Sequence, residues 1–477
     1  IGPSCNDEQM LHRVFEAGAD ACRLNFSHGS LADHARTLAQ IRQAVARRHR
    51  PIAVLGDLCG PKIRVGKIED ANGMGIEAGD VLTISREPVS GAAGRISTTC
   101  PQIVDEVRIG DRVLIEDGLL RFVCVGKIVN ELQCQCTSGG VVREGKGINL
   151  PNTRLSQPAV TERDWEAVRW AIEHSLDYLA LSFVRSADDM RELRAFLTQS
   201  QSDIQLIAKI EKAEAVANID AIIDACDGLM IARGDLGVEM DVAQVPLIQK
   251  SLILRCQQAC KPVIVATQML QSMIENTSPT RAEVSDVANA IFDGADVVML
   301  SAETAIGRFP EASVHMMSHI AQVTESYLNS ADSRAATFIE PRGPELSGAI
   351  ARGVRQIAQD LGVGVVVVYS LTGATARVFS KHRFSASIVA FSSDERALRR
   401  MALLYGVAPY EMPPPSDVSE LVFRVDEFLV REKLARPGDR TVIVAGSSLG
   451  TPGTMNGVVV HTVGEKTLDR ANVPEAV

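Results

Sequence analysis

The feature that most constrains the fold is an alternation of short apolar runs with helical stretches. Seven runs of mostly apolar residues end in polar residues: "CRLNFS" (22–27), "IAVLGD" (52–57), "YLALSF" (178–183), "QLIAKIE" (205–211), "LMIARGD" (229–235), "VIVATQ" (263–268) and "VVMLSAE" (297–303). Helical patterns, such as those over 32–48 and 162–174, lie between them. Apolar runs separated by helices are typical of parallel strands that are buried on both faces and joined by crossover helices.

Seven such strands are one fewer than a closed parallel barrel requires. The opening residues "IG" resemble the end of a further strand, and the chain does not begin with Met. We therefore expect a (β/α)8 TIM barrel whose first strand lies mostly before residue 1. An open parallel sheet is the alternative.

Two other regions depart from the barrel pattern. Between about Pro61 and Pro158 the chain is rich in Val, Ile, Gly and Thr and alternates with period two, as in 111–129. This predicts a small all-β domain inserted into a barrel loop, where the surface tolerates insertions. Beyond a linker at 329–345, five more apolar runs follow: 365–370, 387–392, 408–412, 441–446 and 458–463. Helical stretches separate the first four runs, which predicts an open α/β sheet.

These patterns predict three domains. Domain A, the barrel, comprises residues 1–60 and 158–330. Domain B, the β insertion, comprises 61–157, and domain C comprises 331–477.

Composition restricts the function classes. The formal net charge of −10 argues against a general nucleic-acid-binding protein, which needs a basic face. No apolar stretch is long enough to span a bilayer, and no secretory signal is visible. The ten cysteines contain no CxxC pair, and we expect them to be reduced thiols of a cytoplasmic protein.

The polar residues at the strand ends are the candidates for chemistry, because active sites of such barrels lie at the carboxyl ends of the strands. They are Arg23, Asn25, Ser27, Asp57, Ser182, Lys209, Glu211, Arg233, Asp235, Thr267, Gln268, Ser301 and Glu303. Buried strands do not carry such residues without partners. Their recurrence on strand after strand indicates one shared site.

Glu211 and Asp235 end consecutive strands and could hold one divalent ion, since two carboxylates plus substrate oxygens and water are a usual Mg²⁺ set. The alternative is two rim carboxylates paired with Lys209 and Arg233. The alternation of carboxylates and cations suits a phosphoryl group, whose charge shifts during transfer. Lys209 is the best candidate for the positive charge at the reacting centre.

Other features leave alternatives open. In "GDLCGPKIRVG" (56–66), Asp57 is followed by the cations Lys62 and Arg64, which indicates either an anion site or surface charge. Thr267 could hydrogen-bond a substrate, relay a proton or be a satisfied strand-end hydroxyl. In "TGAT" (372–375), Thr372, Gly373 and Thr375 precede a helix, where phosphate binding and ordinary N-capping explain them equally well.

Several long motifs identify a family. They are "RLNFSHG" (23–29), "GPKIR" (60–64), "KGINLP" (146–151), "KIEKAEAV" (209–216), "ARGDLGVE" (232–239), "ATQML" (266–270), "PTRAEVSDVANA" (279–290) and "MLSAETAIGRFP" (299–310). In this order they resemble pyruvate kinase, from residue 1 into the last domain. The resemblance implies phosphoryl transfer from phosphoenolpyruvate to ADP, giving pyruvate and ATP, in the last step of glycolysis. It also implies a homotetramer.

The resemblance assigns roles to matching positions. Glu211 and Asp235 would bind Mg²⁺, with Mn²⁺ as an alternative. The catalytic set would be Lys209, Arg23 and Thr267, and Gly234 and Asp235 would line the substrate with them. The nucleotide would face Asn25, Ser27, His28, Arg64 and Lys146. Domain B would close as a lid that excludes water.

One position departs from the potassium-dependent members, which carry Glu where this chain has Lys62, and commonly Thr where it has Leu58. The residues whose side chains would bind potassium, Asn25, Ser27 and Asp57, are kept, and Leu58 could still offer its backbone carbonyl. In the family, Lys at this position goes with independence from monovalent cations, and a tethered ammonium can replace a mobile cation. We expect an enzyme that works without K⁺.

In domain C, the loop at 370–375 matches the family's binding site for a sugar-phosphate or AMP activator, whose identity stays open. Lys381, His382 and Arg383 would add positive charge nearby.

Two rivals to the kinase function are another Mg²⁺-dependent barrel, such as a lyase, and a metabolite-binding regulator that has lost catalysis.

Overall fold

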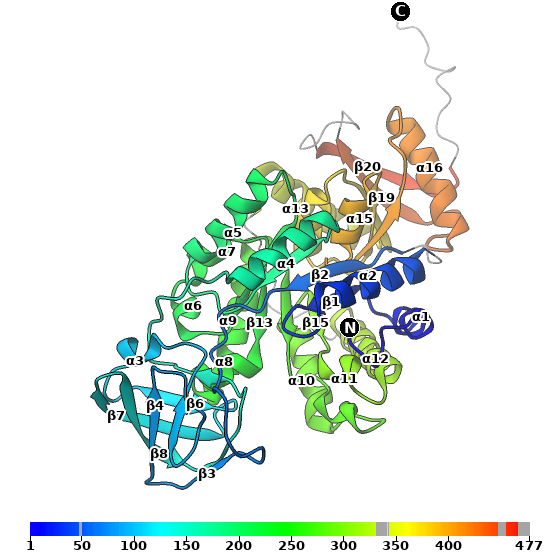
Figure 1. Ribbon diagram of the computed structural model, residues 1–477. Coiled ribbons are helices and arrows are strands. Elements are labelled where there is room, and N and C mark those ends of the chain that lie inside the picture. The colour runs from blue at the N-terminus through cyan, green and yellow to red at the C-terminus, as the bar shows by residue number, and fades with distance from the viewer. Residues whose placement is uncertain (47–49, 331–340, 342, 447–454, 466–477) are drawn as a thin grey trace, which may run out of the picture.

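The computed structural model describes residues 1–477 except 47–49, 331–340, 342, 447–454 and 466–477. Within these residues, three main sheets have hydrophobic cores of their own. Figure 1 shows the inserted β domain and the C-terminal sheet at opposite ends of the central barrel. The inserted domain therefore lies near one end of the barrel strands, and the C-terminal domain covers the other.

The barrel sheet is parallel throughout. Its strands, in spatial order, are β1 (Ala21–Asn25), β2 (Ala53–Asp57), β11 (Tyr178–Leu181), β12 (Gln205–Ile210), β13 (Gly228–Ala232), β14 (Val263–Ala266) and β15 (Val297–Met299). Ile1 donates from its amine to the Arg23 carbonyl (2.9 Å), and Ser4 N donates to the Ala305 carbonyl (3.0 Å) beyond β15. The first residues thus lie between the two edge strands of a curled sheet. The barrel prediction is confirmed and the open-sheet alternative is wrong.

Helices surround this sheet. They are α1 (Glu8–Glu16), α2 (Leu31–Val45), α4 (Glu162–Glu173), α5 (Ala187–Gln199), α6 (Ala213–Ala217), α7 (Ile219–Ala225), α8 (Arg233–Glu239), α9 (Val245–Gln258), α10 (Arg281–Phe292), α11 (Ala302–Ala305) and α12 (Pro310–Leu328), with short 3₁₀ turns at Val242–Gln244 and Gln271–Ile274. Several helices begin at capping boxes. At the start of α10, for example, the Thr280 side chain accepts from Glu283 N and the Glu283 side chain accepts from Thr280 N.

Aspartates stand at the amino ends of the barrel strands. Asp177 precedes β11 and accepts from Val54 N of β2 (2.8 Å). In the same way, Asp296 before β15 accepts from Val263 N of β14 (2.8 Å). Each carboxylate therefore satisfies a backbone donor of the neighbouring strand, which a buried strand end requires.

The inserted domain is all-β apart from α3 (Ile103–Glu106). Its main sheet has the order β10 (Ile148–Asn149), β6 (Arg112–Ile115), β7 (Leu120–Ile128), β8 (Glu131–Ser138), β4 (Val81–Ser85) and β5 (Arg95–Ser97), and β3 (Met74–Ile76) pairs with β9 (Gly140–Val142). The period-two stretch 111–129 is the hairpin of β6 and β7. It turns through Glu116, Asp117 and Gly118, all at positive φ.

The C-terminal sheet has the order β18 (Val407–Glu411), β17 (Ser387–Ser392), β16 (Val365–Tyr369), β19 (Arg440–Gly446) and β20 (Met455–Thr462). The first four strands are parallel, and β20 runs antiparallel to β19. Its helices are α13 (Glu345–Leu361), α14 (Ala374–Lys381), α15 (Glu395–Met401) and α16 (Val418–Arg431). The predicted linker 329–345 falls largely outside the described residues.

The C-terminal domain completes the barrel interior. Leu403, which follows α15, is 2% exposed and belongs to the same apolar cluster as Leu55, Tyr178 and Met230 of the barrel strands. Beside it, Arg399 donates to Asp177 (2.8 Å) and Tyr178 donates to the Arg400 carbonyl (2.9 Å). Residues of one domain thus fill and cap the amino-terminal end of the other.

The chain has neither a membrane-spanning helix nor a disulfide within its described residues. Across the described ranges, no helix is both long and apolar enough to cross a membrane. Each of the ten cysteines is a free thiol, and nine of them are buried.

Candidate active site

The carboxyl ends of β1, β2 and β12 bring charged side chains into one network. The Lys209 ammonium lies 2.6 Å from Ser182 Oγ, 3.2 Å from Asp57 Oδ1 and 3.0 Å from Glu211 Oε1. Arg23 donates from Nε to Asp57 Oδ2 (2.6 Å). Parallel pairing places Asn25 opposite Asp57, so these strand ends reach the same level. The predicted gathering of strand-end residues is present.

Mutual charge keeps this network ionised despite its burial. Burial alone would lower the pKa of Lys209, but the carboxylates of Asp57 and Glu211 raise it above its ordinary value. Burial would likewise raise the pKa of Asp57, but Lys209 and Arg23 hold that pKa below its ordinary value. The ammonium of Lys209 is therefore a fixed positive charge with little water around it.

Asp235 lies close enough to Glu211 for the two carboxylates to affect each other. Helix α8 begins directly after β13, so Asp235 sits in its first turn. Burial and the Glu211 charge raise the pKa of Asp235 to about 6, against the opposing charges of Lys62 and Lys209. Two oxygen ligands held together in this way fit a divalent cation. The described part of the chain contains no group of three or more His, Cys, Asp or Glu residues that could hold a metal ion.

The ion-paired alternative for these carboxylates holds only in part. Glu211 does pair with Lys209, and its Oε2 also accepts from Phe183 N (2.7 Å). Arg233, however, binds Asp286 (2.7 Å) and the Thr267 carbonyl (2.9 Å). The part of the alternative that paired Arg233 with one of these two carboxylates is therefore wrong, because the guanidinium holds the loop after β14 instead.

That loop holds Thr267 in a strained conformation. Its φ is 71° and that of Gln268 is 56°, values that are unusual for residues other than Gly and most of all for a β-branched one. The Thr267 hydroxyl accepts from Gly234 N (2.8 Å) and donates to the Ala266 carbonyl (2.6 Å). The structure thus joins Gly234 and Thr267 at the site. Backbone strain of this kind often marks functional positions.

The residues expected to face nucleotide or potassium lie in two places, at the ends of β1 and β2 and in the inserted β domain. Arg64 donates to the Gly145 carbonyl (2.8 Å), and Lys146 pairs with Glu116 (2.6 Å), both within the β domain. Asn25 accepts from Ser27 N (3.1 Å), His28 is exposed, and the Leu58 carbonyl accepts from Ser182 Oγ (2.7 Å). Leu58 therefore has a protein donor on its carbonyl.

One strand-end candidate, Glu303, has a structural task instead. The buried carboxylate of Glu303 accepts from Leu270 N (3.1 Å) and Ser301 N (2.7 Å). Through its bond with Leu270 N, Glu303 holds the loop after β14 in place.

In domain C, the predictions for the effector loop meet mixed outcomes. Gly373 is the N-cap of α14 at φ 79°, and no side chain caps this helix, so N-capping by the threonines is wrong. Lys381 and His382 are buried, and the Lys381 ammonium pairs with Asp296 of the barrel. Arg383 lies over the Tyr405 ring, 3.8 Å from its centroid, and donates to the Gly294 carbonyl. The expectation that Lys381 and Arg383 add charge to the loop is therefore wrong, because both cations bind the barrel.

The sequence interpretation missed a second polar cluster at the joint between the domains. Asn149, Lys212 and Glu239 meet there, and Arg185 holds the carbonyls of Leu155 (2.8 Å) and Gln157 (2.9 Å). Three of these residues stand inside the quoted motifs "KGINLP", "KIEKAEAV" and "ARGDLGVE", which was the available signal.

Comparisons with known proteins agree with this geometry. The family model for the barrel domain of pyruvate kinase matches residues 1–314, and that for the alpha/beta domain of pyruvate kinase matches 348–461. The chain is 42% identical to a pyruvate kinase of Geobacillus stearothermophilus, over 98% of this chain and 79% of the relative. It is 38% identical to that of Corynebacterium glutamicum, over 98% and 97%.

A solved structure gives the same result. The crystal structure of a pyruvate kinase from Cryptosporidium parvum superimposes with a TM-score of 0.89 at 33% identity, covering 97% of this chain and 94% of that one. Sequence, fold and strand-end chemistry agree, and the chain belongs to the pyruvate kinase family, whose members are phosphotransferases.

Proposed function

We propose that this site transfers the phosphoryl group of phosphoenolpyruvate to ADP, with Lys209 as the fixed positive charge at the reacting centre. The observation that carries the proposal is the buried Lys209 ammonium, held by Asp57, Glu211 and Ser182. A preorganised charge in a site with little water stabilises negative charge that develops during transfer. Arg23, fixed by Asp57, would hold the phosphate, and Thr267 and Gly234 would line the substrate.

Pyruvate kinases use Mg²⁺, and the paired carboxylates of Glu211 and Asp235 would hold it. Both provide oxygen ligands, and the Glu211 charge raises the pKa of Asp235, which a bound cation would counteract. The bound cation would supply charge neutralisation for the substrate oxygens. Arg64 and Lys146, both on domain B, would bring positive charge to the nucleotide when that domain closes over the site as a lid.

The test is a coupled assay for pyruvate formed from phosphoenolpyruvate, ADP and Mg²⁺. Lys209→Met should lower kcat at least about 10²–10³-fold, as removal of one preorganised charge does elsewhere. The matched control is Lys250→Met on α9, which removes an ammonium whose side chain is 55% exposed. Equal activity of Lys209→Met and wild type would refute the assigned role.

We further propose that the enzyme does not require K⁺, because Lys62 supplies the missing charge. Its ammonium opposes the rise in the pKa of Asp235, so its charge reaches the metal site. In tetramethylammonium buffer, added K⁺ should leave wild-type activity nearly unchanged. Lys62→Glu should lower activity in that buffer and recover it when K⁺ is added. A many-fold stimulation of the wild type by K⁺ would contradict the proposal.

An activator site at Thr372, Gly373 and Thr375 belongs to the same proposal. The amino end of α14 carries no side-chain cap, which leaves its backbone donors available for a phosphate. Titration of sugar phosphates and AMP at low phosphoenolpyruvate tests it, and Thr372→Glu should abolish any response.

Sedimentation would test the proposed homotetramer. Fractionation of the source cells would test the cytoplasmic location.

The domain boundaries at 60/61, 157/158 and 330/331 are proposals of the same kind. The separate cores of the three sheets support them.

The lyase and regulator alternatives lack comparable support. Family models of pyruvate kinase match residues 1–314 and 348–461, and Lys209, Glu211 and Asp235 are all present.

A further inference from the structure

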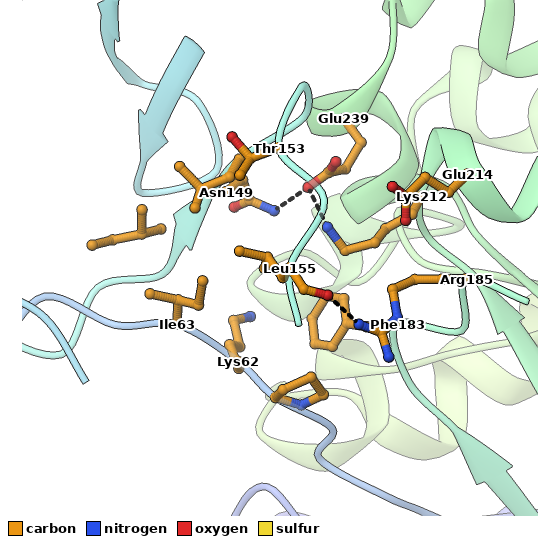
Figure 2. A pocket seen from close by; sticks show the side chains of 13 residues that line it. Lys62, Ile63, Asn149, Thr153, Leu155, Phe183, Arg185, Lys212, Glu214 and Glu239 are labelled. Atoms are coloured by element: carbon orange, nitrogen blue, oxygen red, sulfur yellow. Dashed lines mark hydrogen bonds and ion pairs between the residues drawn. The ribbon is translucent and has the colours of Figure 1, made fainter. Parts of the chain in front are cut away.

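A buried carboxylate outside the reacting centre joins the lid to the barrel. Glu239 is the last residue of α8 and is 5% exposed. Its Oε1 accepts from Asn149 Nδ2 (3.2 Å) and lies 3.5 Å from the Lys212 ammonium. Figure 2 shows these three side chains converging on the wall of a cleft that Lys62 and Phe183 also line. A carboxylate is buried at this depth only when it is paired.

The three partners come from segments with different tasks. Asn149 belongs to β10 of the lid, Lys212 directly follows Glu211, and Glu239 lies four residues beyond Asp235 on α8. Residues four apart on a helix lie on the same side, one turn from each other. The pair of Lys212 and Glu239 thus ties together the two segments that carry the expected metal ligands.

The lid has a second attachment in the same cleft, which differs in kind. Arg185 donates to the carbonyls of Leu155 and Gln157, in the segment by which the chain returns from the lid to the barrel, and is itself held by Asp189 (3.0 Å). These bonds hold the backbone of the returning chain and do not reach α8. Asn149 contacts the carboxylate of α8 itself, so it links the position of the lid to the position of that helix.

We propose that Glu239 is a positioning residue that sets the separation of Glu211 and Asp235 through Lys212 and couples it to lid docking through Asn149. The inference rests on the proposed divalent-cation site at Glu211 and Asp235. Partners that orient metal ligands typically account for about 10–100-fold in metal affinity. Because coupling between two binding events is reciprocal, cation binding should also favour the docked lid.

The first experiment measures binding of Mn²⁺ to the full chain without substrates, from the electron paramagnetic resonance signal of the free ion. Glu239→Ala should weaken Mn²⁺ binding about tenfold or more, Lys212→Met should weaken it comparably, and Glu239→Gln should lie between Glu239→Ala and wild type. The matched control is Glu214→Gln. Glu214 lines the same cleft, and within the described residues its ion pair is with the exposed Arg154 (3.6 Å). It should bind Mn²⁺ as the wild type does.

The second experiment measures amide hydrogen exchange in the lid segment 146–155 with and without Mn²⁺. In the wild type, Mn²⁺ should slow exchange there. In Asn149→Ala this cation-dependent protection should disappear. Mn²⁺ affinity should fall by no more than the factor by which lid docking strengthens Mn²⁺ binding in the wild type. That factor is typically about 5–150-fold for coupled sites.

Two controls separate the possible failures. Glu211→Gln should abolish Mn²⁺ binding; if it does not, the proposed cation site itself is wrong. If Glu211→Gln loses Mn²⁺ while both Glu239 variants and Lys212→Met bind it normally, the positioning role of Glu239 is overturned. Glu239→Gln keeps the side-chain volume, and its circular dichroism and melting midpoint, compared with Glu214→Gln, show whether the fold is intact.

Discussion

At the scale of single residues, burial decides which charges can act. Lys209 and Asp57 remain ionised because each has the other's opposite charge at 3.2 Å, whereas an isolated charge at the same depth would neutralise. Thr267 shows the same dependence on surroundings, since its positive φ persists only because Arg233 and Gly234 hold both its carbonyl and its hydroxyl. The sequence predicted these residues as candidates, because each follows an apolar run. It offered the pairing of Lys209 with Glu211 only as an alternative, and it did not predict the contacts of Lys209 with Asp57 and Ser182.

His382 provides a test of burial at the same scale. It has no exposed surface, and burial together with the charges of Arg352 and Arg355 lowers its pKa to about 4 from an ordinary 6.5. The folded protein therefore resists protonating it, while the unfolded chain protonates it near pH 6.5. Stability from this group is complete above pH 6.5 and is lost as the pH falls towards 4.

The measurement is the unfolding midpoint against pH for wild type and His382→Leu. The midpoint of the wild type should fall more steeply between pH 6.5 and 4 than that of the variant. Parallel curves over this interval would show that His382 does not control acid sensitivity.

At the scale of elements, an aspartate that precedes one barrel strand can hold the backbone of the neighbouring strand, as Asp177 and Asp296 do. Asp177 bonds Val54 N of β2 and also Arg399 of α15, so one carboxylate connects two strands and a helix of another domain. The strands themselves were predictable because apolar runs followed by polar ends are local patterns. The antiparallel direction of β20 was not, because strand direction depends on where the chain returns to the sheet.

Asp177→Ala should therefore destabilise the protein. The Val54 N–H would lose its partner, at a cost of about 1–3 kcal/mol, and Arg399 would lose its buried acceptor. Asp188→Ala on α5 is the control, since its side chain is 84% exposed and pairs with Arg191 on the surface. We expect its effect to stay within about 0.5 kcal/mol. Urea-induced unfolding, followed by fluorescence and circular dichroism, compares the two variants, and equal midpoints would contradict the structural role of Asp177.

At the scale of the whole molecule, the C-terminal domain is part of the barrel interior. Leu403 fills the amino-terminal end of the barrel, and the ion pair between Lys381 and Asp296 has no exposed surface on either side chain. Burial lowers the pKa of Lys381, against the opposing charge of Asp296. The inserted β domain, attached through Asn149 and Arg185, lies at the other end of the barrel (Figure 1). The barrel therefore carries contacts from both other domains.

Leu403→Ala should destabilise the barrel, although the residue belongs to the other domain. Truncating a buried Leu costs about 2–5 kcal/mol, because a cavity remains in the core. Leu346→Ala on α13 is the control, since Leu346 is 58% exposed. The barrel tryptophans Trp165 and Trp170, the two in the chain, report its unfolding by fluorescence. An unchanged tryptophan transition in Leu403→Ala would show that Leu403 does not contribute to the stability of the barrel.

The sequence by itself determined the alternation of strands and helices, the inserted β domain, the polar residues at the strand ends and the family. All of these depend on short-range patterns or on contiguous motifs, which a chain carries wherever it folds. The tertiary structure alone decided that Lys381 and Arg383 face the barrel, that Arg233 anchors a loop, that Leu403 fills the barrel end, and that Glu239 meets Asn149 and Lys212. These contacts join residues far apart in the chain. Which of them form depends on which buried charges and apolar surfaces the folded domains bring together, and short-range sequence patterns do not contain that information.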